Sequence, residues 1–334
     1  MSTTCDSRHG CRCCLWLALV AGLLVAAAAD AEWHRREAPL MGTTVSVELW
    51  HEDAASGRAA ADAVMAEYHR VNAVLSTYIH DSMLSHVNRE AHAAPVVIDA
   101  EVYALLERAL EVSRLSDGAF DITFDSVGHH YDFRAARVPD DDEREAGLAT
   151  LDWRLVRLDP EHSTVEFAAE GVRLNLGGIG KGYAIERGAE ILRARGIEHA
   201  LLNAGGDSRV IGDRRGQPWV VGIRDPRDRD RVVARLPLVD EAISTSGDYE
   251  RYFEHEGARH HHILDPATGR PAEGVRSATV IGPDATLADA LSTTVFVLGV
   301  ERGMRLVAAL DGYEAVIVDG EGRMFHSAGF EAAQ

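Results

Sequence analysis

The chain has 334 residues, of which 46% are hydrophobic, and its formal net charge at pH 7 is −19. This length and apolar content suit one large globular domain or two small ones with an ample core. The acidic balance argues against nucleic acid or an anionic membrane surface as a partner. An anionic substrate would therefore need local positive charge or a metal ion.

The N-terminus has the pattern of an export signal. Arg8 and Arg12 form a basic start, residues 13–29 are apolar, and the Ala-Asp-Ala tripeptide at 29–31 offers small residues for cleavage before Glu32. The apolar run is about the length of a short membrane span, so an uncleaved anchor is the alternative to a cleaved signal peptide.

The cysteines support the same division of the chain. All four lie within residues 1–31, so residues 32–334 would hold no disulfide, thiolate metal site or Cys nucleophile. We predict a signal peptide or anchor at residues 1–31 and one functional domain at residues 32–334. The protein is expected to be exported, and to be periplasmic or outward-facing at the inner membrane.

Hydrophobic periodicity predicts the first elements of this domain. Alternating apolar residues predict a strand at 44–50, and helical spacing predicts a helix at 59–75. Residues 76–88 are polar and typical of a loop. A second helix is expected at 100–115, with Asp99 as its cap and Gly118 just past its end.

The middle of the chain contains a hairpin and a glycine-rich turn. Residues 132–150 are acidic and typical of a surface segment, and residues 153–158 and 164–167 predict a hairpin around Asp159-Pro160. A strand-like run at 172–176 then leads into a glycine-rich stretch and a helical pattern.

Short strands and two helices complete the pattern. Six runs of strand type follow the glycine-rich stretch, at 200–202, 210–211, 219–223, 232–236, 242–243 and 278–281. A helix from Asp284 to Leu298, a helix at 301–310 and a strand at 315–318 come last. This mixture predicts an α+β fold, with short, largely antiparallel strands and helices around them.

The glycine-rich stretch is Asn175-Leu-Gly-Gly-Ile-Gly-Lys-Gly-Tyr183. Glycines let the backbone approach a ligand closely, and a helix N-terminus offers free N–H groups that suit a phosphate. Lys181 is the only lysine in the chain, which indicates that a compact, mobile ammonium is needed here. The spacing does not match a nucleotide-triphosphate P-loop or the dinucleotide G-x-G-x-x-G pattern. A tight strand-to-helix turn without a ligand is the alternative.

Asp289 and Thr293 are four residues apart on the helix predicted after Asp284, so their side chains share one face. A carboxylate and a hydroxyl form an oxygen pair that suits Mg²⁺ better than zinc. The alternative is a surface Asp and a Thr that faces the core.

Three further motifs have two interpretations each. His260-His261-His262 could supply a metal ligand or a base, or could be a polar edge strand before an Asp-Pro turn. The segments 203–207 and 244–248 both end in Gly-Asp, and could be ligand cradles or tight turns.

The order of the motifs is more specific than any one of them. Eight motifs follow one another along the chain: Met41-Gly-Thr43, Leu75-Ser-Thr-Tyr78 with Asp81-Ser82, Gly118-Ala-Phe-Asp-Ile-Thr123, the glycine-rich stretch, Asn203-Ala-Gly-Gly-Asp207, Thr245-Ser-Gly-Asp248, His262-Ile-Leu-Asp-Pro-Ala-Thr-Gly269 and Ala288-Asp-Ala-Leu-Ser-Thr293. In this order they closely resemble the FAD:protein FMN transferase (ApbE) family, from about Ala38 to the end of the chain.

The resemblance implies a fold and a reaction. Members are single α+β domains with a mixed sheet, related to the T-fold. They bind FAD and Mg²⁺, for which Mn²⁺ can substitute, and transfer FMN to a Ser or Thr hydroxyl of a target protein through a phosphoester bond, with release of AMP. The implied partner is a subunit of a membrane redox complex on the exported side, which agrees with the signal-like N-terminus.

The resemblance also implies roles for individual positions. Expected FAD contacts are Met41, Tyr78, Ala119, Phe120, Asp121, Asn175, Gly178, Lys181 and Leu264. The expected metal ligands are the carbonyl of Gly180 and the side chains of Asp289 and Thr293. Asn175 departs from the family, which usually has Asp here; it keeps one carbonyl acceptor, loses the charge and gains donors.

The chemistry requires a base as well as a metal. Mg²⁺ would neutralise charge that develops on the phosphate oxygens, and a base must take the proton of the attacking hydroxyl. His262 is the candidate base, with Asp265 or Asp248 as candidate orienting groups. The alternatives to the transferase are an FAD pyrophosphatase, in which water replaces the acceptor hydroxyl, and a non-catalytic flavin carrier.

Overall fold

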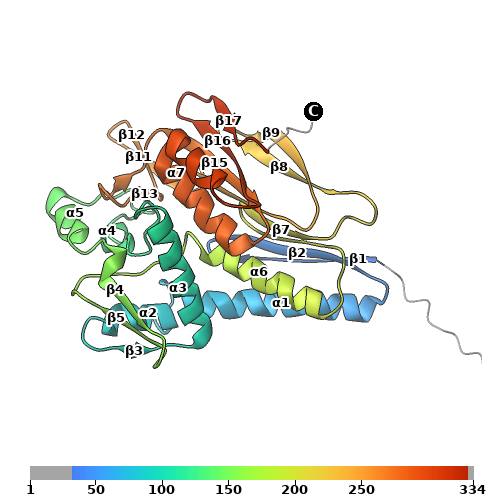
Figure 1. The fold of residues 1–334 in the computed structure, drawn as a ribbon, viewed down its shortest axis with the longest axis horizontal. Coiled ribbons are helices and arrows are strands. Elements are labelled where there is room, and N and C mark those ends of the chain that lie inside the picture. Colours follow the sequence, from blue (N-terminus) through green and yellow to red (C-terminus); the bar gives the residue numbers. More distant parts are fainter. Residues whose placement is uncertain (1–31, 330–334) are drawn as a thin grey trace, which may run out of the picture.

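The computed structural model describes residues 32–329. An eight-stranded sheet organises them, as can be followed in Figure 1. Every strand pairing in this described part of the chain is antiparallel. The order is β1-β2-β6-β7-β10-β15-β16-β17. These strands are β1 (Glu32–Leu40), β2 (Thr43–His51), β6 (Ala200–Ala204), β7 (Asp207–Ile211), β10 (Ala242–Gly247), β15 (Val275–Gly282), β16 (Glu314–Asp319) and β17 (Met324–His326).

Three long helices cover one face of this sheet: α1 (Ala54–Leu75), α6 (Gly180–Ala194) and α7 (Ala285–Ala308). Asp53 caps α1, because its side chain accepts the Ser56 N–H at 2.7 Å. Gly188 brings α6 close to its neighbours, since a Cβ there would lie 2.7 Å from the Leu202 side chain. The three helices and the sheet therefore enclose the main apolar core.

A long hairpin, β8 (Trp219–Asp225) and β9 (Asp228–Leu238), covers the other face. Ala242 and Val280 belong to the main core, whereas the next residues, Ile243 and Ile281, pack with Trp219 in a second cluster. Successive strand residues point to opposite faces, so the second cluster lies on the side of the sheet away from the helices.

A smaller group of elements packs against the helix layer. It contains α2 (Met83–Glu90), β3 (Val96–Val97), α3 (Ala100–Leu115), α4 (Asp125–Gly128), α5 (Asp141–Leu148), a 3₁₀ turn (Trp153–Leu155), β4 (Val156–Asp159) and β5 (Thr164–Phe167). Of these, α2 contacts α1 and α3 contacts α7. Two short hairpins follow β10 in sequence: β11 (Tyr252–His255) with β12 (Ala258–His261), and β13 (Leu264–Asp265) with β14 (Arg270–Pro271).

The predicted α+β class is confirmed, and so are most of the predicted elements. The two C-terminal helices form one element, α7, with a break at Gly299, where φ is +76°. The hairpin around Asp159-Pro160 is present, although residues 153–155 form a 3₁₀ turn. The predicted helix at 100–115 begins after Asp99, but the Asp99 side chain accepts no capping hydrogen bond within the described residues.

The predicted strand at 172–176 is wrong. This run is irregular, because its backbone groups bond to a side chain and a loop in place of a neighbouring strand. Asn88 donates to the Leu174 carbonyl at 2.8 Å and accepts the Leu174 N–H at 2.7 Å, and the Asn175 N–H bonds to the Ile122 carbonyl. Apolar composition alone did not separate a buried irregular segment from a strand.

Two predicted loops contain helices. Within 76–88, Ser82 caps α2 by accepting the Ser85 N–H, and Leu84 and Val87 are buried. Within 132–150, Asp140 and Glu143 form a reciprocal capping box at the start of α5. Both helices are short and rich in polar residues, so the residues that cap them did not stand out in the sequence.

The predicted export segment, residues 1–31, lies outside the described residues, so the cleavage site and the alternative anchor stay predictions. Within residues 32–329, no helix combines the length and the apolar character needed to cross a membrane.

Candidate functional site

The glycine-rich turn places the N-terminus of α6 against α7. The Leu176 carbonyl accepts the Gly180 N–H at 2.7 Å, and α6 begins at Gly180. A Cβ on Gly182 would lie 2.1 Å from the Ala285 carbonyl oxygen, and one on Gly178 would lie 3.3 Å from Thr293 Oγ1. These two glycines therefore permit a close approach between the turn and the face of α7 that carries Thr293.

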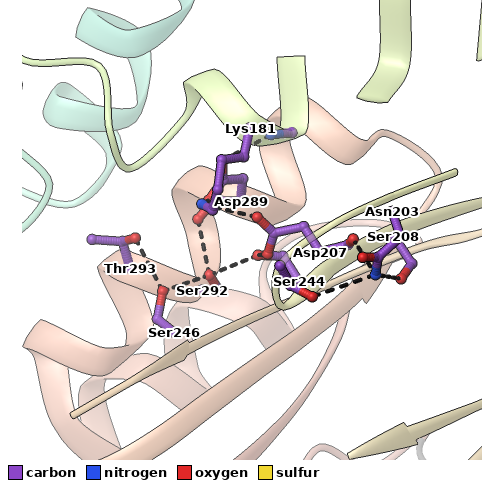
Figure 2. A network of polar contacts seen from close by, with 11 residues as sticks. Lys181, Asn203, Asp207, Ser208, Ser244, Ser246, Asp289, Ser292 and Thr293 are labelled. Carbon is purple, nitrogen blue, oxygen red and sulfur yellow. Dashed lines mark hydrogen bonds and ion pairs between the residues drawn. The ribbon is translucent and has the colours of Figure 1, made fainter. Parts of the chain in front are cut away.

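Lys181 lies between two buried carboxylates (Figure 2). Its Nζ is 3.1 Å from Asp289 Oδ1 and 2.9 Å from Asp207 Oδ2. Asp289 Oδ2 accepts the Gly182 N–H at 2.9 Å. The two carboxylates come from α7 and β7, and their residues are 1% and 2% exposed, respectively. One ammonium thus compensates two buried negative charges.

Burial and charge determine the ionisation of this group. Burial alone would lower the pKa of Lys181, but the carboxylates of Asp207 and Asp289 outweigh it and raise that pKa. Burial raises the pKa of Asp289 to about 6, with Asp207 adding to the rise and Lys181 opposing it. The raised pKa keeps the Lys181 ammonium charged at pH 7.

A chain of hydroxyl groups connects Asp207 to Thr293 (Figure 2). Ser244 donates to Asp207 Oδ1, and its Oγ lies 3.0 Å from Ser292 Oγ. Ser246 Oγ lies 2.8 Å from Ser292 Oγ and 3.1 Å from Thr293 Oγ1. This hydrogen-bonded series joins β7, β10 and α7. It fixes the Asp207 carboxylate at one end and the Thr293 hydroxyl at the other.

The carboxylate of Asp289 and the hydroxyl of Thr293 fit a divalent cation. Asp289 and Thr293 present oxygen atoms on one face of α7, and Asp289 Oδ1 already attracts one positive charge, the Lys181 ammonium. Within residues 32–329, no group of three or more His, Cys, Asp or Glu side chains could hold a metal ion. A site there would consist of few protein oxygens with water and substrate as further ligands, which is the usual pattern for Mg²⁺.

Asn175 lies against another carboxylate. Its Nδ2 donates to Asp125 Oδ1 at 3.2 Å, and its Oδ1 accepts the Gly177 N–H at 2.9 Å. Burial raises the pKa of Asp125, and Asn175 and Arg173 oppose that rise. An Asp at position 175 would place two carboxylates in contact, so the amide is the residue that suits this neighbour.

The loop at 118–123 stands beside the glycine-rich turn. A Cβ on Gly178 would lie 3.1 Å from Phe120 Cε2, and Phe120 is buried. The Asp121 carboxylate accepts the N–H groups of Thr123 and Trp153 at 2.8 and 2.9 Å, so it braces the loop. Burial raises the pKa of Asp121, and these bonds oppose the rise. Ala119 is partly exposed beside them.

The His262 side chain contacts a backbone carbonyl group, and the charge of Lys181 affects its pKa. Its Nδ1 is 3.3 Å from the Arg251 carbonyl oxygen, which can only accept, so Nδ1 is the donor and Nε2 is left to accept a proton. Burial lowers the pKa of His262 to about 4, and His261 and Lys181 contribute to the fall. The ring is therefore neutral at pH 7.

The hypothesis that Asp265 or Asp248 orients His262 is wrong for this structure. Asp265 accepts the Ala267 N–H in its own turn at 2.9 Å, and Asp248 lies 3.6 Å from Arg259. The Arg251 carbonyl takes the orienting position, because β11 and β12 bring Arg251 and His262 together across their hairpin.

Three expected FAD contacts lie farther along the surface or in the core. Tyr78 is 78% exposed, and its hydroxyl accepts from Arg251 Nη1 at 3.0 Å. Met41 occupies the turn between β1 and β2 with φ of +54°. Leu264 is buried in an apolar cluster with Val127 and Phe253.

Sequence reasoning missed four side chains of the site. Asp207 was included only in a segment interpreted as a ligand cradle or a tight turn, and Ser244, Ser246 and Ser292 received no individual role. Two signals could have found them: Ser244 and Ser246 alternate on one strand face, and Ser292 lies three residues after Asp289 on α7. The segment 203–207 is a tight hairpin turn, yet the Asp207 side chain points to Lys181 and Ser244.

Comparisons with known proteins agree on one family. The model of the ApbE family matches residues 41–317. An FAD:protein FMN transferase of Treponema pallidum is 37% identical over 317 residues, which cover 89% of this chain and 87% of that protein. One from Vibrio cholerae is 33% identical and covers 88% of this chain and 90% of its own length.

Solved structures show the same similarity in three dimensions. The ApbE protein of Thermotoga maritima superimposes with a TM-score of 0.84 at 35% identity, over 90% of this chain and 98% of that chain. The flavin transferase ApbE of Vibrio cholerae superimposes with a TM-score of 0.80 at 29% identity, over the same shares of the two chains.

Proposed function

The chain belongs to the ApbE family, and we propose that this FAD:protein FMN transferase moves FMN from FAD onto a Ser or Thr hydroxyl of an acceptor protein. In the balanced reaction, the hydroxyl oxygen bonds to the phosphorus of the FMN half. The pyrophosphate P–O bond to that phosphorus breaks, and AMP leaves. The hydroxyl proton goes to a base.

The arrangement around Lys181 carries this proposal. Asp289, Thr293 and the carbonyl of Gly180 would hold Mg²⁺, which when bound neutralises charge on phosphate oxygens and orients the leaving group. The N-terminus of α6 lies beside them, and its partial positive charge favours a phosphate. Lys181 has a flexible stem and can contact the substrate phosphates as a point charge.

His262 would act as the base. Its Nδ1 donates to the Arg251 carbonyl oxygen, so Nε2 is the atom that takes the proton. The low pKa keeps the ring unprotonated throughout the neutral range. Phe120 and Thr293 both lie against Gly178, so Phe120 would form one wall of the flavin site beside the metal position.

The remaining parts of the proposal concern the cellular setting. The basic and apolar N-terminal residues support export, which would place the enzyme in the periplasm or facing outward at the inner membrane. The acceptor would then be a flavin-carrying subunit of a membrane redox complex that exposes a Ser or Thr on that side.

Flavin transfer to an acceptor tests this function. The protein is incubated with FAD, Mg²⁺ and an acceptor that contains the target Thr, and the acceptor is then denatured. Fluorescence that stays with the acceptor and disappears when its Thr is replaced by Val supports the transferase. Free FMN and AMP without a labelled acceptor would indicate a pyrophosphatase, and intact FAD would indicate a carrier.

A further inference from the structure

The position of Lys181 gives the site two carboxylates and a single cation. Asp289 and Asp207 belong to elements far apart in sequence, yet both contact the same ammonium, at 3.1 and 2.9 Å. Both residues are almost fully buried, whereas Lys181 is partly exposed and its charge sits at the end of a four-carbon stem. Lys181 is therefore the member of the group that is free to move.

The two carboxylates are held in different ways. Asp289 Oδ2 is bonded to the Gly182 N–H, which leaves Oδ1 toward the ammonium. Asp207 Oδ1 accepts from Ser244, and its Oδ2 is buried, 2.9 Å from Lys181 Nζ, with no hydrogen bond that meets normal geometry in the described structure. Asp207 is thus fixed by the hydroxyl chain and aimed at Lys181.

We propose that Lys181 is an internal counter-ion that a divalent cation displaces from Asp289, and that Asp207 keeps the displaced ammonium within the site. The inference rests on the proposed metal role of Asp289 in flavin transfer. A divalent cation on Asp289 repels the Lys181 ammonium. Rotation of the lysine side chain then carries the ammonium toward Asp207 and toward solvent. Asp207 is then a positioning residue that acts through Lys181 and does not itself ligate the metal.

This exchange explains the choice of residue at position 181. The chain has 33 arginines and one lysine. The planar, rigid fork of an arginine would hold a carboxylate with two bonds, and its exchange for a metal would be harder. A lysine binds each carboxylate through one point charge, so it can leave one and stay with the other.

Binding of Mn²⁺ alone, without FAD, tests the exchange in the whole protein by titration calorimetry or by the electron paramagnetic resonance signal of free Mn²⁺. Lys181→Met removes the competing cation, so the dissociation constant for Mn²⁺ should fall about tenfold or more. Arg305→Met is the matched control, because it removes one positive charge from an exposed pair with Glu301 on the same chain. Its dissociation constant should stay at the wild-type value.

A double-mutant cycle separates the role of Asp207 from direct ligation. With Lys181 present, Asp207→Asn should weaken Mn²⁺ binding, because the ammonium then stays on Asp289. In the Lys181→Met background the same change should have a much smaller effect, whereas a direct ligand would lose the same affinity in both backgrounds. Equal losses would overturn the positioning role.

Stability provides a second measurement. Lys181→Met leaves two buried carboxylates without a counter-ion, so it should lower the Tm in chelator and gain more Tm from Mn²⁺ than the wild type does. Lys181→Gln keeps a donor toward Asp289 and serves if the Met variant does not fold. Mn²⁺ affinity that is unchanged or weaker in both variants would overturn the exchange.

The outcomes also separate this inference from the proposed function. A wild-type protein whose Mn²⁺ binding does not depend on Asp289 would overturn both the metal role and the exchange. An Asp289-dependent site with unchanged affinity in Lys181→Met would overturn the exchange alone, and flavin transfer to the acceptor would stand.

Discussion

Replacing Asp289 with Asn removes a charge from the centre of the site and keeps the shape of the side chain. The amide oxygen can still accept the Gly182 N–H, and Lys181 keeps Asp207 as its partner at 2.9 Å. The transfer rate at ordinary Mg²⁺ should fall by about 10²–10³, the range typical for loss of one electrostatic stabiliser of a transition state. High Mg²⁺ or Mn²⁺ should restore part of it.

The same substitution is expected to leave the fold intact. Burial raises the pKa of Asp289 from 3.8 to about 6, and one pKa unit corresponds to about 1.4 kcal/mol. Ionised Asp289 therefore costs about 3 kcal/mol of folding free energy relative to an exposed Asp. The folded pKa is the higher one, so this cost is complete above pH 6 and disappears below pH 4. A neutral Asn does not carry it.

The assay compares the transfer rate against metal concentration for the wild type, Asp289→Asn and Thr293→Val, with denaturant unfolding in excess chelator alongside. Thr293→Val removes only a neutral oxygen, so its metal curve should shift less. In chelator, Asp289→Asn should match the wild type in free energy of unfolding or exceed it by up to about 3 kcal/mol. Wild-type activity that persists in chelator, or an unchanged metal curve for Asp289→Asn, would refute the metal role. If Asp289→Asn is less stable than the wild type by about 2 kcal/mol, the Asp289 carboxylate has a structural role.

Four further predictions address the terminus, the ligand, the base and the pH dependence of stability. The mature protein should begin near Glu32; N-terminal sequencing from the native host checks this, and an intact Met1 or Ser2 in the membrane fraction would indicate an anchor. FAD should bind more tightly than FMN in a fluorescence titration, because Tyr78 and the loop at 119–121 are expected to contact the whole dinucleotide; equal affinities would contradict this. His262→Ala should lose about 10²–10⁴ in transfer rate and keep most of its FAD affinity; a wild-type rate would assign the base to another group, with His260 and Asp248 next to test. Burial lowers the pKa of His261 from 6.5 to about 4, so between these pH values the folded state binds fewer protons than the unfolded state. The free energy of unfolding should therefore fall as the pH drops from 6.5 to about 4. His261→Gln should reduce this dependence, and a pH profile identical to that of the wild type would contradict the prediction.

Local patterns in the sequence were enough for the class of fold and for most of its elements. Alternation at Val45, Val47 and Leu49 corresponds to β2, and these residues are fully buried. Helical spacing from Val64 to Leu75 corresponds to the buried face of α1. These predictions succeeded because one face of each element packs on the core, and the spacing of apolar residues records that face.

Two predictions failed because the hydrogen bonds or the burial of the segment depended on contacts with other parts of the chain. Residues 172–176 look like a strand, but Asn88 and Ile122 satisfy their backbone from other segments. Residues 76–88 look like a loop, but Ser82 caps the short helix α2, whose Leu84 and Val87 are buried. Pairing and burial of this kind depend on segments that are distant along the chain.

By itself, the sequence determined the α+β class, the glycine-rich turn, the pair Asp289 and Thr293, and the order of motifs that marks the family. Only the tertiary structure decided that Lys181 contacts both Asp289 and Asp207, and that hydroxyl groups on β10 and α7 connect Asp207 to Thr293. Spacing of i and i+4 describes one face of one helix. Lys181, Asp207 and Asp289 lie on three different elements. Only the packing of α6, β7 and α7 brings both carboxylates within 3.1 Å of Lys181 Nζ.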